Sequence, residues 1–161
     1  MRGAVVATLT AVLLAGCYAP VGVPIGAGAD PDEIPRRVAI GADVATARER
    51  AHATLAELGF RRRDPAAERW TRRFPDDEVW AFCPPLRIED DDTYDTVHAD
   101  GGEVTLKLAV ASAEDGARVT ITPRFVGHYR DPAVFAGTRR RPCDSFGVIE
   151  TRFVEAMRAA G

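Results

Sequence analysis

The chain has 161 residues, a formal net charge of −3 and 46% hydrophobic residues, which suffices for one domain with a single hydrophobic core. Its mildly acidic balance argues against a nucleic acid partner. Lys107 is the one lysine among its basic residues, and the chain contains no Asn or Gln. No side-chain amide is therefore present for an oxyanion hole or for reading a nucleic acid base.

The N-terminal segment has the order of a secretory signal: Arg2, then an apolar run from Ala4 to Leu14, then small residues. The run is too short for a membrane span, which needs about 20 apolar residues. It ends in Leu14-Ala15-Gly16-Cys17, which resembles the lipobox of bacterial lipoproteins. The resemblance implies a signal peptide over residues 1–16, cleavage before Cys17 and fatty chains such as palmitate on Cys17. An ordinary secreted protein cut elsewhere is the alternative.

The same resemblance implies a location in the bacterial cell envelope. In Gram-negative lipoproteins an Asp after the lipidated Cys retains the protein in the inner membrane, and this chain has Tyr18 there. The resemblance therefore implies the outer membrane, facing the periplasm or the cell surface. Residues 17–36 are rich in Gly and Pro, which predicts a flexible tether between the lipid and one domain over residues 37–161.

The first half of the domain predicts a short strand, a helix and a hairpin. The strand covers residues 37–40, and Asp43 is the predicted N-cap of the helix. The helix has an apolar stripe made of Val44, Ala47, Ala51, Leu55 and Leu58. Gly59 is expected to end it. Residues 60–63 and 68–74 then form a hairpin, residues 79–83 form a strand, and the acidic run 89–92 reads as a loop.

The second half predicts a longer hairpin and a second helix. Residues 103–112 and 119–125 alternate apolar and polar side chains around a turn at 113–116. Pro123 indicates an edge strand or the point where pairing stops. Residues 127–142 read as a loop, and a helix begins near Asp144 and Ser145. The predicted fold is α+β: a two-layer sandwich with an antiparallel sheet of four or five strands and both helices on one face, helix-grip-like.

Cysteine spacing predicts one disulfide. With Cys17 assigned to lipid, Cys83 and Cys143 remain as an even pair in an exported chain. Two separate buried thiols are the alternative. A zinc site is disfavoured because no Cys or His lies two to four residues from either cysteine.

Candidate catalytic and metal-binding residues are weak. Ser145 lies in Cys-Asp-Ser-Phe-Gly, one glycine short of G-x-S-x-G, and we expect Ser145 or Asp144 to be an ordinary N-cap. The histidines His52, His98 and His128 lack ligand spacing. The acidic residues 89–95 fail the calcium-loop pattern, because Gly102 stands where a bidentate glutamate belongs. We expect no catalytic residue, no cofactor and no metal.

Two further groups of side chains are candidates for binding. Arginine suits planar oxyanions, so the arginine clusters favour contact with anionic lipid headgroups or an acidic protein, with solvated surface charge as the alternative. These clusters are Arg61, Arg62 and Arg63; Arg72 and Arg73; and Arg139, Arg140 and Arg141. Trp70, Trp80 and Phe82 are expected in the core, with a ligand pocket as the alternative.

Three functional hypotheses follow. The leading one is a non-enzymatic lipoprotein that binds or scaffolds an envelope component, with the membrane as partner through its anchor. The second is a carrier that holds a lipid or small apolar ligand between helices and sheet. The third is a hydrolase that uses Ser145 or His98.

Overall fold

The computed structural model describes residues 33–75, 80–90, 93–130 and 137–160. The signal peptide, the lipobox with Cys17 and the tether up to residue 32 lie outside this part. The elements in chain order are β1 (Arg37–Ile40), α1 (Val44–Glu57), β2 (Arg61–Asp64), β3 (Arg69–Phe74), β4 (Ala81–Phe82), β5 (Leu86–Asp90), β6 (Thr93–Val97), β7 (Gly102–Ala113), β8 (Gly116–Arg130), β9 (Thr138–Ser145) and α2 (Val148–Ala159).

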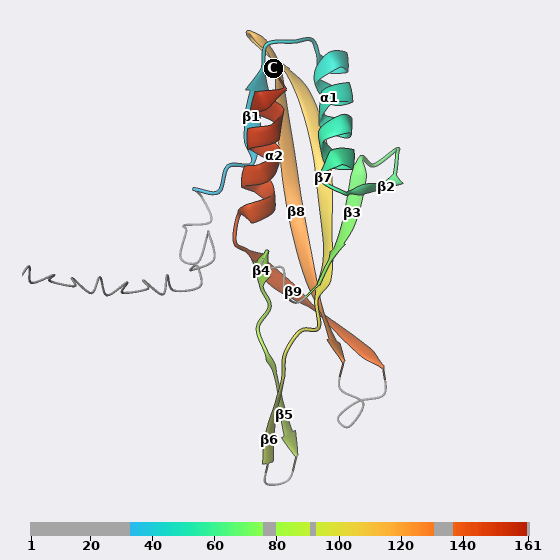
Figure 1. Cartoon of the computed structure of the whole chain (residues 1–161), viewed down its shortest axis with the longest axis vertical. Coiled ribbons are helices and arrows are strands. Elements are labelled where there is room, and N and C mark those ends of the chain that lie inside the picture. The colour runs from blue at the N-terminus through green and yellow to red at the C-terminus, as the bar shows by residue number, and fades with distance from the viewer. Residues whose placement is uncertain (1–32, 76–79, 91–92, 131–136, 161) are drawn as a thin grey trace, which may run out of the picture.

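The described elements form one large antiparallel sheet, two helices and a small separate hairpin. The sheet has seven strands in the order β2-β3-β7-β8-β9-β4, with β1 beside β8, and β5 pairs with β6 alone. Both helices lie on one face of the sheet, where α1 contacts α2, β7 and β8 (Figure 1). The α+β class is confirmed, and the predicted sheet of four or five strands was too small.

Helix α1 has the ends that the sequence predicted. The Asp43 carboxylate accepts hydrogen bonds from the amides of Ala45 and Thr46 at 2.8 and 3.0 Å. Gly59 has a φ of 80°, and the amide of Phe60 donates to the Leu55 carbonyl at 2.9 Å. This hydrogen bond from Phe60 back to Leu55 is the Schellman cap, which a glycine in the left-handed region permits.

Strand β8 lies in the middle of the sheet, so the edge-strand reading of Pro123 was wrong. It pairs with β7 from Gly116 to Gly127, and its other side pairs first with β1, up to Thr120, and then with β9 from Phe125. Pro123 lies in the gap between these two partners. Proline has no amide proton to donate, so it is tolerated at a position without a partner strand on that side. Pairing on this side does stop at Pro123, as the alternative prediction expected.

The remaining corrections fall on polar segments. Residues 127–130 and 138–142 belong to β8 and β9 and are not loop, and Glu89 and Asp90 close β5. Residues 91–92 of the acidic run lie outside the described part. Helix α2 starts at Val148 after Gly147, whose φ is 79°, so neither Asp144 nor Ser145 is its N-cap. Both of those residues end β9.

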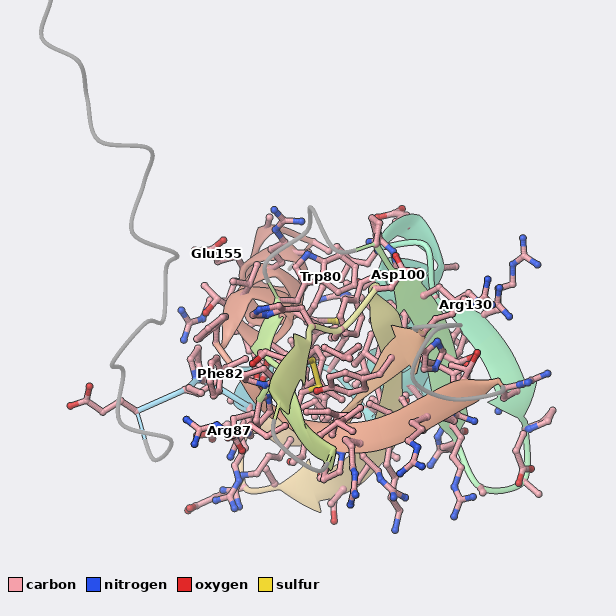
Figure 2. All side chains as sticks on the ribbon, turned by 90° about the horizontal axis from the view of Figure 1, so that it is seen from below. Trp80, Phe82, Arg87, Asp100, Arg130 and Glu155 are labelled. Atoms are coloured by element: carbon pink, nitrogen blue, oxygen red, sulfur yellow. A yellow bond between two sulfur atoms is a disulfide. The ribbon has the colours of Figure 1, made fainter. Side chains whose placement is uncertain are left out.

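The core fills the space between the helices and the sheet. Its fully buried side chains include Leu55 from α1, Leu106 and Ile121 from the sheet, and Phe153 and Met157 from α2. Trp70 and Trp80 are buried, which confirms them as core aromatics. Phe82 is 50% exposed, so its core assignment was wrong (Figure 2). Ile34, just before β1, is also buried and packs against Gly147.

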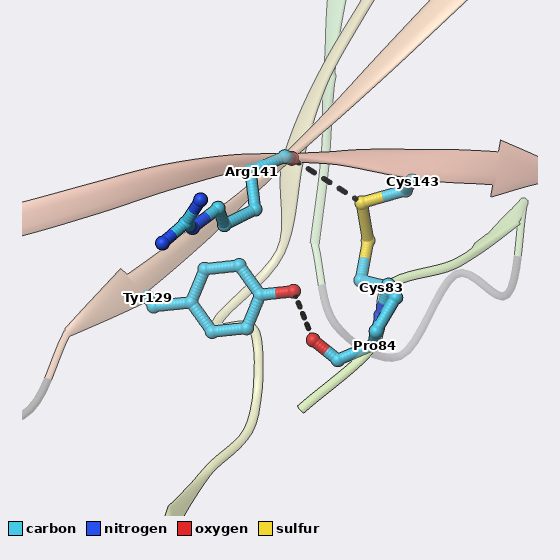
Figure 3. Close-up of a disulfide and its surroundings, with 5 residues drawn as sticks. All are labelled: Cys83, Pro84, Tyr129, Arg141 and Cys143. Atoms are coloured by element: carbon cyan, nitrogen blue, oxygen red, sulfur yellow. Dashed lines mark hydrogen bonds between the residues drawn. A yellow bond between two sulfur atoms is a disulfide. The ribbon is translucent and has the colours of Figure 1, made fainter. Parts of the chain in front are cut away.

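The predicted disulfide between Cys83 and Cys143 is present (Figure 3). It joins the segment after β4 to β9, and both sulfur atoms lie against Gly127 of β8. Beside it, the Tyr129 hydroxyl donates to the Pro84 carbonyl at 2.6 Å. The 3.7 Å approach of the Cys143 sulfur to the Arg141 carbonyl is a contact only, because a bonded sulfur carries no proton. The disulfide and this hydrogen bond therefore hold residues 83–85 against the buried Tyr129.

Candidate functional site

The sheet has one face under the helices and one face that no described helix covers. In an antiparallel pair, residues opposite each other point to the same side, so the register assigns each side chain to a face. The pair Val104 and Phe125 lies on the buried side, and the pair Thr105 and Arg124 lies on the other. We call this second side the open face.

The open face is rich in exposed cations. Its outward positions hold Arg37, Arg61, Arg69, Arg73, Lys107, Arg118, Arg124, Arg130 and Arg140, all exposed. The outward acids are Asp64, Glu103 and Asp144. Asp64 accepts from the amides of its own turn, and Glu103 pairs with Arg140 at 3.4 Å. A chain with a net charge of −3 thus carries a strongly basic surface on one side.

The cations converge around a hollow of about 460 Å³ at the end of the open face away from the helices. We call it the arginine pocket; it is lined by Arg63, Arg73, Asp100, Glu103, His128, Arg130, Thr138 and Arg140. Asp100 and Arg130 lie on the same side of the molecule (Figure 2). A second hollow of about 620 Å³ shares Arg63, Arg73 and Glu103 with it, so the basic surface continues towards β2.

His128 is the one titratable ring in the arginine pocket. Its backbone pairs with the segment before β7, through Gly101 and Asp100. Its Nε2 atom is buried, and no group in the described residues bonds to it. Burial first, and then the positive charge of Arg140, lower the pKa of His128 below its usual 6.5, while Glu103 acts against them. The neutral ring is therefore favoured in the empty pocket.

The other arginines of the pocket have no anionic partner among the described residues. Arg140 pairs with Glu103, whereas no ion pair or hydrogen bond reaches Arg63, Arg73 or Arg130 within that part of the chain. Like charges gathered in this way repel one another. An anion bound among them relieves that repulsion.

The arginine clusters of the sequence are split between the two faces. Arg72 turns inward, where its guanidinium lies 4.4 Å from the centre of the Trp80 ring and donates to the Leu58 carbonyl at 2.8 Å. Arg73, next in sequence, turns outward and meets Arg63 and Arg140 in the pocket. The sheet thus brings together one member of each predicted cluster.

Sequence reasoning missed His128 and Arg130 as pocket residues, because it placed them in a loop. The signal that could have found them is the alternation along β8. Arg118, Arg124 and Arg130 recur at even positions, with buried residues such as Phe125 and Tyr129 at odd ones. Carried past residue 125, that pattern predicts a continuous strand with a basic outer side.

The hydroxyl of Ser145, the candidate nucleophile, is engaged in hydrogen bonds within the fold. Its hydroxyl donates to the Glu150 carboxylate at 2.7 Å and accepts from the Gly147 amide at 3.0 Å. Glu150 is fully buried, and the Arg36 guanidinium lies 3.9 Å from it. In the described part no histidine bonds to Ser145, so no general base is positioned beside it.

The other histidines and the metal candidates are likewise accounted for where they are described. His52 Nε2 lies 2.9 Å from Glu68, which also pairs with Arg62 at 3.0 Å and so ties α1 to the β2–β3 hairpin. His98 is exposed. Among the described residues no group of three or more His, Cys, Asp or Glu side chains is arranged to hold a metal. The side chains of residues 89–95, the calcium candidate, lie outside that description.

A scan against models of known protein families found no match, and neither did searches of the curated proteins and the solved structures. None of the described helices is long and apolar enough to cross a membrane. The fold and the site define a class by themselves: an α+β domain whose helices cover one face of an antiparallel sheet and whose other face is rich in arginine.

Proposed function

We propose that the chain is a lipid-anchored envelope lipoprotein of the non-enzymatic binding type, which binds an anionic membrane surface through its open face. Fatty chains on Cys17 hold it in the membrane, most simply the outer one. The tether, which ends before the buried Ile34, lets the domain turn its basic side to the headgroups. The layout of two helices on one sheet face is helix-grip-like, and that likeness carries no function by itself.

The observation that carries this proposal is the separation of charge between the two sides of the sheet. Among the described residues nine exposed cations face outward against three acids, two of which are already engaged. Each basic residue near an anionic membrane contributes about 1 kcal/mol, so several acting together give useful binding. An anchored domain also meets its own membrane at high effective concentration.

The chemistry of the open face favours headgroups over other polyanions. The outward positions of β3, β7 and β8 carry no Phe, Tyr or Trp, and Phe82 of β4, opposite Asp144, is the one exposed large hydrophobic side chain in the described residues. Single-stranded nucleic acid binds to sheets largely by stacking its bases on such aromatics. An acidic envelope protein remains an outcome of the test below.

The carrier and hydrolase hypotheses have less support. The space between helices and sheet is filled by buried side chains such as Leu55, Leu106 and Phe153, and both described hollows are lined by charged groups. Ser145 is bonded to Glu150 and Gly147. Neither arrangement offers an apolar cavity or an activated nucleophile within the described residues.

Charge reversal on each side of the domain tests the proposal. The chain from residue 18, without lipid, should sediment with phosphatidylglycerol vesicles at low salt and not with phosphatidylcholine vesicles. Arg118→Glu with Arg124→Glu should abolish sedimentation. Arg152→Glu with Arg158→Glu, an equal charge change on α2, should weaken it only slightly. Equal loss in both pairs would mean that net charge alone matters, and the assignment to the open face would be wrong.

Metabolic labelling tests the anchor separately. A palmitate analogue fed to cells that express the full chain should label it, and Cys17→Ser should remove the label. If the wild type stays unlabelled, or if Cys17→Ser keeps its label, the lipoprotein assignment fails. The vesicle experiment remains meaningful in that case.

A further inference from the structure

The arginine pocket is more specific than the rest of the open face. It is a half-open hollow that gathers three arginines without an anionic partner in the described residues, namely Arg63, Arg73 and Arg130. A charged surface can attract a membrane without gathering several unpaired arginines around one hollow. The arginine pocket is therefore a candidate site for one specific anionic ligand.

The donors around the pocket match a phosphate group. Each arginine presents a planar fork of N–H groups that suits two oxygens of one oxyanion. Thr138 adds a hydroxyl, and the buried Nε2 of His128 adds a nitrogen without a partner in the described part. A terminal phosphate has three oxygens and close to two negative charges, enough to engage several of these donors together.

The two acids of the pocket limit how much charge it accepts. Glu103 already pairs with Arg140, and Asp100 stands exposed among the lining residues. Four arginines against two carboxylates leave an excess of about two positive charges, which one phosphate monoester neutralises. A chain of several phosphates would bring its outer groups close to Asp100 and Glu103.

We propose that the arginine pocket binds a single phosphate monoester group and that His128 takes up a proton as the group binds. The inference rests on the proposed function, because it names the chemical group that the open face recognises most strongly. A headgroup with a terminal phosphate and free phosphate in solution share this chemistry.

The proton uptake follows from the charges that face His128. Burial and the positive charges of Arg140 from β9 and Arg73 from β3 disfavour the charged ring, and Glu103 from β7 favours it. Arg63 from β2 and Arg130 from its own strand line the same pocket. Asp100 is the other acid of the pocket, and its backbone amide donates to the His128 carbonyl at 2.7 Å. A bound dianion adds a strong opposite charge, which shifts the balance towards the imidazolium. Binding should therefore strengthen as the pH falls through the raised pKa of His128, and level off where phosphate itself takes up a proton.

The test follows the imidazole signals of His128 by NMR in the full chain, held in neutral detergent micelles. Inorganic phosphate should raise the pKa of His128 by about one pH unit, since an opposite charge within a few ångströms has an effect of that size. Chloride at the same ionic strength, a monoanion without oxygens for the arginine forks, should raise it much less. Equal responses to the two anions would overturn the assignment to phosphate.

Substitutions inside and outside the arginine pocket show where phosphate binds. Arg73→Gln and Arg130→Gln should each weaken the phosphate response about tenfold, as the loss of a charged hydrogen bond does. Arg124→Gln and Lys107→Gln remove one charge each from the same face outside the pocket, and they should leave it within about twofold. His128→Gln should make phosphate affinity nearly independent of pH. If the pocket variants and the control variants lose the same amount of phosphate response, the pocket is not the binding site.

Doped micelles distinguish the sources of phosphate and separate this inference from the proposed function. Phosphatidic acid carries a terminal phosphate, and phosphatidylglycerol carries only a diester. A rise in the His128 pKa with phosphatidic acid supports a headgroup, and a rise with inorganic phosphate alone supports a soluble ligand. If neither probe moves the His128 signals while phosphatidylglycerol vesicles still bind the open face, the pocket inference is overturned and the proposed function stands.

Discussion

His128 and Arg140 stand directly opposite each other in the pairing of β8 with β9, and both side chains point to the open face. Residues paired in this way keep a fixed separation, so neither can leave the other without breaking the ladder. The positive charge of Arg140 therefore acts permanently on the His128 ring. Burial, the larger cause, and this neighbouring charge together lower the pKa of His128.

The first prediction concerns stability against pH in the absence of phosphate. Because folding lowers the pKa of His128 below 6.5, the unfolded chain binds the proton more readily. The contribution of His128 to stability is neutral well above that pH and becomes unfavourable as the pH falls through it. Urea denaturation should show a larger loss of stability between about pH 8 and about pH 5.5 in the wild type than in His128→Gln. Equal losses would contradict the prediction.

The second prediction concerns Arg72. Arg72→Met keeps the aliphatic stem but removes the hydrogen bond to Leu58 and the stacking on Trp80. We expect a loss of about 2 kcal/mol in the free energy of unfolding, by chemical denaturation. Arg69→Met, an exposed outward position on the same strand, should change it by less than about 0.5 kcal/mol. Similar losses in the two variants would show that Arg72 contributes only its charge.

The third prediction concerns Gly127. A Cβ atom there would lie 2.9 Å from the sulfur atoms of both Cys83 and Cys143, closer than real Cβ atoms come. We expect Gly127→Ala to lower the free energy of unfolding by about 1–3 kcal/mol, because neither the strand nor the disulfide can move far. Gly41→Ala, where nothing lies within 4 Å, is the matched control and should not destabilise. If Gly127→Ala is as stable as that control, the close packing described here is wrong.

The fourth prediction concerns the disulfide. It closes a loop across a sequence separation of 60, which corresponds to about 4 kcal/mol in the chain-entropy description. Cys83→Ser with Cys143→Ser, or reduction of the wild type, should each lower the free energy of unfolding by about this amount. Reductant should have no effect on the double variant. A wild type that is indifferent to reductant would show that the bond is not formed or does not stabilise the fold.

Local sequence signals predicted the elements that local chemistry forms. Asp43 and Gly59 marked the ends of α1, and alternating residues marked the β7–β8 hairpin. Each signal acts between residues close in sequence, by capping or by a turn. These features could be read without knowing what lies beside them.

The missed elements depend on partners distant in sequence. Strand β9 carries Arg139, Arg140, Arg141 and Pro142, a composition that predicts a loop, and it is a strand because β8 offers it a free edge. The acidic end of β5 likewise extends because β6 pairs with it. The arginine pocket gathers residues from β2, β3, β7, β8 and β9, so no single stretch of sequence reveals it.

The division of β8 between two neighbours also bears on the order of assembly. Arg37 of β1 pairs with Thr120 of β8, so β1 has no partner strand until residue 120 has been synthesised. Closures over such long separations are slow. The pairing of β1 with β8 is therefore expected to be a late step in folding, after the β7–β8 hairpin has formed.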